Sequence, residues 1–160
     1  MSFSESQRIN LGLRVVVLVG MLPAVLFMAR EYQRNPNSEN FYLLLLMIAF
    51  PVVIYLLFLN NKAKTRIDSL GIHYQYWPFI ARWRTINWSD IQRVSIKNIY
   101  PLTDFGGWGY KFGRKKKGII LSGDKAIYIH LKNEKVFAIT TSQPEQARSA
   151  LVQWAEEKLA

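Results

Sequence analysis

The sequence has 160 residues, enough for one domain or for one modest domain with an appendage. Half of the residues are hydrophobic, yet 21 lysines and arginines stand against 11 aspartates and glutamates, giving a net charge of +10. The apolar content excludes an intrinsically disordered chain, and the absence of cysteine excludes disulfide-stapled domains, iron–sulfur clusters and thiol catalysis.

The first apolar segment covers Val15 to Ala29 and becomes long enough for a membrane span when it begins at Leu11, with Arg14 near its end. A cleaved signal peptide is the alternative. The residues before Ala29 are Phe27 and Met28, however, so the small residue expected three positions before a cleavage site is missing. This favours a retained helix over about 11–29.

The second apolar segment, residues 41–59, has nineteen residues and no charge. As a helix it is about 28 Å long, close to the hydrocarbon thickness of a bilayer. It predicts a transmembrane helix, kinked at Pro51. With the polar turn between the two segments, residues 1–61 predict an N-terminal two-helix transmembrane hairpin.

Basic residues near the ends of the two spans predict the orientation. Five flank the outer ends and two lie in the turn: Arg8, Arg14, Lys62, Lys64 and Arg66 against Arg30 and Arg34. The positive-inside rule then places both termini in the cytoplasm of a multi-pass protein of the inner (cytoplasmic) membrane.

Residues 62–160 carry seventeen of the 21 basic residues. Their pattern changes to short alternating runs, which predict about seven strands. A C-terminal helix is predicted over 143–158, with Ser142 and Glu145 forming a capping box. Its apolar stripe ends at Trp154, which we expect to lie in the core. The order of elements favours a small barrel or two packed sheets covered by the helix.

Several short motifs resemble those of bacterial pleckstrin-homology (PH) membrane proteins: Leu70-Gly71-Ile72, Trp88-Ser89-Asp90-Ile91, Phe105-Gly106-Gly107-Trp108-Gly109 and the segment 139–145 before the last helix. The resemblance implies an α+β fold in which a seven-stranded, partly open barrel over 62–160 is capped by the C-terminal helix. The resemblance does not imply a catalytic activity, because that fold serves mainly for binding.

A basic run is the sharpest local feature: Lys111, Arg114, Lys115, Lys116 and Lys117. It favours contact with anionic lipid head groups, which attract basic residues near the surface. A solvated loop is the main alternative, and nucleic-acid binding is disfavoured. The nearby aromatics Trp77, Phe79 and Trp83 are predicted to lie in the head-group zone, although core packing would account for about half of the aromatics in this stretch.

The sequence pattern indicates no catalytic, cofactor-binding or metal-ligating residues. The only histidines, His73 and His130, have no carboxylate at a ligand-like spacing, and Gly106-Gly107 does not fit a phosphate loop. The sequence therefore predicts a non-enzymatic membrane protein that binds lipid and a protein partner through a cytoplasmic domain. The alternative is a homo-oligomeric channel or transporter component, for which Arg14, Pro23 and Pro51 are the relevant residues.

Overall fold

The computed structural model describes residues 3–9 and 11–159, without the side chains of Leu11, Leu13, Arg14, Val17 and Phe58. The chain forms two compact units, one made of two sheets and the other of two long helices. The two-sheet unit takes residues 3–8 together with residues 62–159, so the helices are an insertion within it.

The first sheet is antiparallel, in the order β1-β2-β3-β4. Its strands are β1 (Phe3–Arg8), β2 (Lys62–Asp68), β3 (Gly71–Trp77) and β4 (Ile80–Asn87). A tight turn joins β2 to β3. There Gly71 has no side chain to collide with the carbonyl oxygen of Ile86, which a Cβ at this position would overlap.

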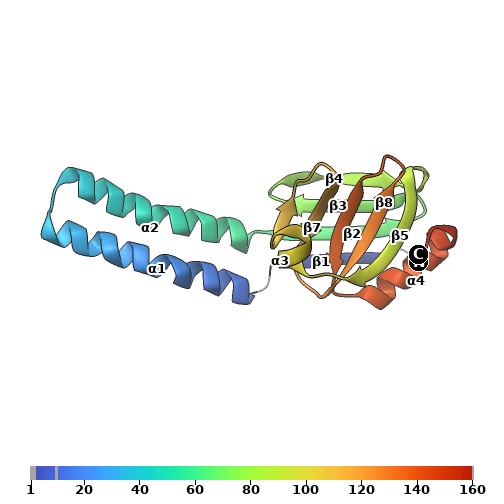
Figure 1. The fold of residues 1–160 in the computed structure, drawn as a ribbon, viewed down its shortest axis with the longest axis horizontal. Coiled ribbons are helices and arrows are strands. Elements are labelled where there is room, and N and C mark those ends of the chain that lie inside the picture. The colour runs from blue at the N-terminus through green and yellow to red at the C-terminus, as the bar shows by residue number, and fades with distance from the viewer. Residues whose placement is uncertain (1–2, 10, 160) are drawn as a thin grey trace. The chain divides into compact units, whose positions relative to one another are not determined.

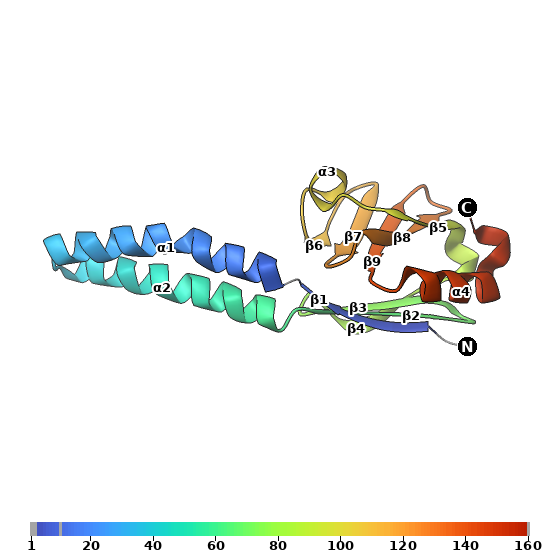
Figure 2. The same ribbon diagram turned by 90° about the horizontal axis from the view of Figure 1, so that it is seen from below.

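The second sheet has the order β5-β8-β9-β7-β6, with β7 and β9 parallel and the other pairs antiparallel. Its strands are β5 (Ile91–Asn98), β6 (Gly109–Lys111), β7 (Lys116–Ile120), β8 (Lys125–Leu131) and β9 (Val136–Thr141). Two helices accompany it, α3 (Pro101–Phe105) and α4 (Pro144–Ala155), with short 3-10 turns η1 (Trp88–Asp90) and η2 (Glu156–Lys158). In Figure 2, α4 lies at one end of this unit and α3 lies with β6 at the other.

The core of this unit lies between the sheets. Tyr76 and Ile72 of the first sheet are buried, as are Ile127 and Ile139 of the second. From α4, Ala147, Ala150 and Leu151 are buried. The prediction that Trp154 lies in the core is wrong, since it is 37% exposed. In the last turn of α4, Ala155 is buried, whereas Val152 and Trp154 are exposed.

Strand β1 is fastened to the second sheet by buried polar side chains. Glu5 is 5% exposed, and its carboxylate accepts hydrogen bonds from Thr141 Oγ1 at 2.6 Å, from the Ser142 amide at 2.7 Å and from Ser142 Oγ. Gln7 Nε2 donates to the Thr140 carbonyl at 2.6 Å. Ser142 therefore does not form the expected capping box: the N-cap of α4 is Gln143, without a side-chain cap, and Ser142 binds a carboxylate from the other end of the chain.

The second unit consists of α1 (Leu11–Arg34) and α2 (Ser38–Leu59), which lie side by side (Figure 1). The turn between them is ordered by side chains, because Asn37 Oδ1 accepts from the Asn40 amide at 2.7 Å at the start of α2. Of the helices in the described parts of the chain, one, over Ser38–Leu57, is long and apolar enough to cross a membrane, and 6% of that stretch is buried.

The expected fold class is wrong in three respects. The chain does not begin with a two-helix hairpin, because Phe3–Arg8 forms strand β1 of the first sheet. Nine strands in two sheets replace the expected seven-stranded barrel. Only α2 meets the length and composition of a membrane span among the described helices, where two spans were expected.

Candidate functional site

One end of the first sheet carries both connections to the helices. Arg8, the last residue of β1, pairs with Lys62, the first of β2, and Lys62 pairs with Trp77 at the end of β3. The turn from Trp77 to Ile80 lies at the same end, and its side chains are open to solvent: Trp77 is 50% exposed and Phe79 is 66% exposed. The chain leaves toward α1 and returns from α2 beside an exposed aromatic turn.

A chain of aromatic rings links this turn to the second sheet. Phe79 stacks on Tyr76 with ring centroids 5.6 Å apart, and Tyr76 lies 6.1 Å from Tyr110 of β6. Tyr110 meets the edge of Phe112 at 4.3 Å, and Phe112 is 77% exposed. The β3–β4 turn and the loop between β6 and β7 are therefore neighbours at one end of the two-sheet unit.

The predicted basic residues lie on that loop and on the strands beside it. Arg114 and Lys115 are in the loop, and Lys116 and Lys117 begin β7; all four are exposed. Lys111 ends β6, and its Nζ donates to the Gly106 carbonyl at 3.4 Å. In the described part of the chain, the ion pairs found both involve Asp68, so none neutralises this run. Lys111 and Arg114 lie within two residues of Phe112 in the chain, and Phe112 is linked to Phe79 through Tyr110 and Tyr76.

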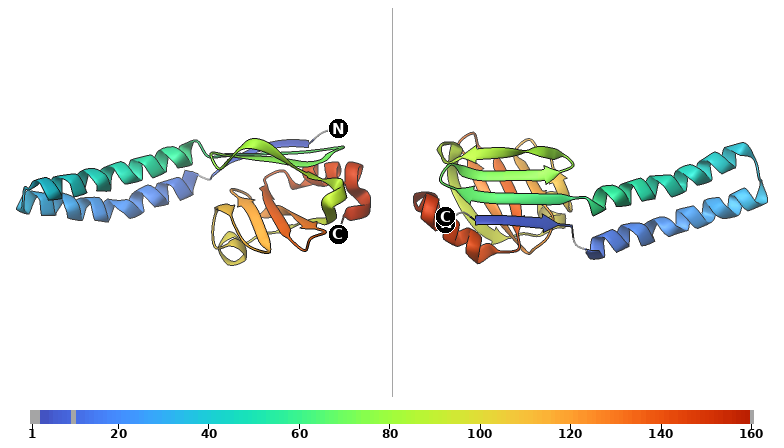
Figure 3. Two further views of the ribbon diagram at one scale, coloured as in Figure 1. Left: turned by 90° about the horizontal axis from the view of Figure 1, so that it is seen from above. Right: turned by 180° about the vertical axis from the view of Figure 1, so that it is seen from behind.

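Trp83 is placed apart from the other two predicted aromatics. It lies in the middle of β4, beside Arg84, which pairs with the inward-facing Tyr74. Since side chains alternate along a strand, Trp83 is on the outer face of the sheet, and it is 47% exposed. In Figure 3 (right) no helix of the two-sheet unit covers this outer face. Trp77 and Phe79 join the basic loop at one end of the unit, while Trp83 does not.

Sequence reasoning missed two members of this end, Tyr110 and Phe112. Both flank the basic run, and an aromatic beside a lysine run was the available signal. Their contact with the β3–β4 turn depends on the two sheets meeting, which local pattern does not encode. Gly106 ends α3 in the left-handed conformation with φ 66°.

The two histidines have different surroundings. His73 Nε2 lies 2.8 Å from Asp68 Oδ1, and its Nδ1 lies 2.8 Å from Thr85 Oγ1. Burial alone would raise the pKa of Asp68, but hydrogen bonds from His73 and from the Leu70 amide lower it. Burial and the nearby cations Arg93 and Lys97 lower the pKa of His130. Within the described residues, no group of three or more metal-ligating side chains is found.

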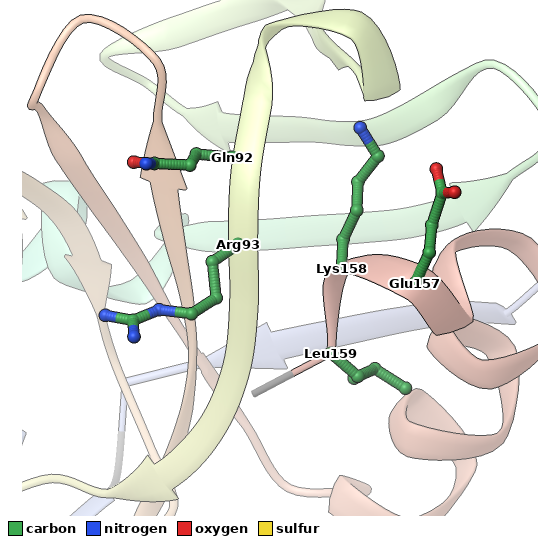
Figure 4. A pocket seen from close by; sticks show the side chains of 5 residues that line it. All are labelled: Gln92, Arg93, Glu157, Lys158 and Leu159. Atoms are coloured by element: carbon green, nitrogen blue, oxygen red, sulfur yellow. The ribbon is translucent and has the colours of Figure 1, made fainter.

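A pocket of about 350 Å³ lies between β5 and the residues after α4 (Figure 4). It is lined by Gln92, Arg93, Glu157, Lys158 and Leu159. Lys158 Nζ donates to the carbonyls of Trp88 at 2.9 Å and Ile91 at 3.2 Å. Leu159 forms a parallel bridge to Val94, so the free edge of β5 is partly occupied by the chain itself. Nothing in this pocket resembles a catalytic arrangement of side chains.

The residues relevant to a channel lie on the two helices. Pro23 is exposed on α1 and Pro51 is buried in α2. The side chain of Arg14 lies outside the described residues.

Comparison with known proteins adds no family to this geometry. No family model matches the chain, and no curated protein matches it either.

Proposed function

We propose that this protein is a non-enzymatic integral membrane protein that presents its two-sheet unit at the cytoplasmic membrane surface, where it contacts anionic lipid and binds a protein partner. The observation that carries the proposal is the exposed apolar surface of the helix pair. Eighteen large hydrophobic residues of α1 and α2 are exposed, among them Phe27, Leu46, Ile48 and Phe50. A contiguous apolar surface of this kind marks contact with lipid or protein and is not maintained in water.

Helix α2 is the segment that crosses the membrane in this proposal. Its 22 residues are about 33 Å long, enough for the hydrocarbon core. Because β1 and β2 are paired, the chain that leaves after Arg8 returns to the same sheet at Lys62. If α2 spans the membrane, the chain between Arg8 and Lys62 has to pass through it again, and α1, whose described residues do not themselves meet the length and composition of a span, is the segment that accompanies α2.

The proposed contact with lipid uses the end of the two-sheet unit from which the chain leaves and to which it returns. Exposed Trp77 and Phe79 suit the head-group zone, where Trp and other aromatics gather. The unpaired cations from Arg114 to Lys117 suit anionic head groups, at up to about 1 kcal/mol for each basic residue near the surface.

The triple variant Lys115→Ala, Lys116→Ala, Lys117→Ala tests the lipid contact. In the full chain, reconstituted into nanodiscs, we expect phosphatidylglycerol to slow hydrogen exchange in residues 109–120 relative to phosphatidylcholine alone. The triple variant is expected to lose this difference, since up to about 3 kcal/mol of attraction is removed.

A matched control removes three lysines elsewhere in the same unit: Lys125→Ala, Lys132→Ala, Lys135→Ala. It has the same net charge and should keep the effect of phosphatidylglycerol. An equal loss in both triple variants would show a response to net charge alone, and the basic loop would then have no special role.

A further inference from the structure

Strand β4 has an open hydrogen-bonding edge. It is the last strand of the first sheet and pairs with β3 on one side only. Of its eight residues only Ile80 is buried, so the strand is exposed on both faces. Figure 3 (right) shows β4 at an edge of the sheet, with no other strand or helix of the two-sheet unit beside its free side.

The other long edges of the described sheets are less available. The edge of β5 carries the bridge from Leu159, next to the pocket of Figure 4. Strand β1 is also an edge, but it has six residues, two fewer than β4. Strand β6 is an edge as well, but it has three residues, too few for a stable pairing. An added strand would therefore find its longest free template on β4.

The charge of β4 selects the kind of segment that could pair with it. Arg82 and Arg84 are exposed, and neither belongs to an ion pair found in the described part of the chain. Residues 69–89 contain no aspartate or glutamate, and neither do residues 105–123, which include the neighbouring β6 and the basic loop. Acidic side chains at this edge would be attracted, and basic ones repelled.

A second copy of this chain does not fit the same edge. If two β4 strands paired antiparallel about Trp83, Arg82 of one copy would lie opposite Arg84 of the other. Like charges directly opposite each other destabilise a strand pair. Charged residues on an edge are also a common defence against such self-pairing.

We infer that β4 binds an extended acidic segment of another protein, which adds a fifth strand to the first sheet. Backbone hydrogen bonds along the edge supply the general affinity. Arg82 and Arg84 are two residues apart on β4, with a register shift against β3 between Arg84 and Ile80, and their cations attract acidic side chains of the segment. Trp83 supplies an exposed ring on the opposite face.

The inference is tested with two labelled octapeptides of equal charge, one with alternating glutamate and valine and one with its four glutamates grouped at one end. The full chain is held in nanodiscs of phosphatidylcholine, so that anionic lipid does not compete. We expect the alternating peptide to bind about tenfold tighter and to slow hydrogen exchange in residues 80–87.

The double variant Arg82→Glu, Arg84→Glu should lower the affinity for the alternating peptide by about tenfold or more. Its matched control, Lys97→Glu, Arg148→Glu, makes the same change in net charge at exposed positions on β5 and α4 and should have a much smaller effect. Circular dichroism of both variants verifies that they are folded.

Three results would overturn the inference. The two peptides could bind equally, which would indicate attraction to net charge without strand pairing. The two double variants could weaken binding equally. Exchange in residues 80–87 could respond to phosphatidylglycerol and not to the peptide, which would assign Arg82 and Arg84 to the lipid surface. None of these results bears on the effect of the Lys115, Lys116 and Lys117 variant, so the two proposals can fail separately.

Discussion

Glu5→Leu is expected to destabilise the two-sheet unit by about 3–5 kcal/mol, because Glu5 is buried and its carboxylate accepts several hydrogen bonds. The carboxylate accepts from Thr141 Oγ1, from the Ser142 amide and from Ser142 Oγ, all near the start of α4. Without it these donors face an apolar side chain, and a buried donor without a partner loses its hydration uncompensated. Strand β1 and the start of α4 should loosen together.

Urea unfolding of the full chain in detergent, followed by near-ultraviolet circular dichroism, measures this effect. Glu5→Gln keeps one acceptor oxygen, so its free energy of unfolding should lie between those of the native protein and of Glu5→Leu. Ser4→Leu is the control, since Ser4 is on the exposed side of the same strand and its change should cost no more than about 0.5 kcal/mol. Glu5→Leu could lower the free energy of unfolding by less than about 1 kcal/mol, which is the cost of an average substitution. That result would mean that the carboxylate does not fasten β1.

The double variant Leu45→Arg, Ile48→Arg is expected to prevent stable insertion of α2 into the membrane. Both residues are exposed, 55% and 45% respectively, and both lie near the middle of the apolar stretch. An arginine at the centre of a membrane helix costs about 2.5–3.5 kcal/mol on insertion scales. If the helix were instead exposed to water, the same arginines would improve solubility, so the two accounts predict opposite signs.

Extraction of membranes with alkaline carbonate measures the outcome. Native protein should remain in the pellet, and the double variant should be released or degraded. Asn40→Arg, in the polar turn region before the apolar stretch, is the control and should stay in the pellet. A native protein released by carbonate would contradict membrane insertion outright.

The sequence predicted the elements whose pattern is local. Residues 41–59 carry no charge and form most of α2, and the alternating run Ile72, Tyr74, Tyr76 faces the core of β3. Helix α3 has five residues, too few for a repeating apolar stripe, although Pro101 suits the first turn of a helix.

Strand β1 was missed for a different reason. Its inward residues are Phe3, Glu5 and Gln7, so two of the three buried positions are polar and the run lacks the hydrophobic alternation of a strand. Their partners are residues 140–142, more than 130 positions away, and only the folded structure shows that these donors are there.

The candidate site was predictable in composition and not in arrangement. The run from Arg114 to Lys117 and the exposed Trp77 and Phe79 are visible in the sequence. Their meeting through Tyr76 and Tyr110 requires the two sheets to pack against each other. The separation of Trp83 from this end follows from its place in the middle of β4.

In the proposed arrangement α2 crosses the membrane and the two-sheet unit lies in the cytoplasm. The protein has no cysteine, so single cysteines report directly on sidedness. Pro36→Cys lies in the turn between α1 and α2, and Asp124→Cys lies in an exposed turn of the two-sheet unit. With a membrane-impermeant maleimide on cells whose outer barrier is permeabilised, Pro36→Cys should be labelled while Asp124→Cys reacts only after the inner membrane is broken. Labelling of both positions from the same side would contradict the account.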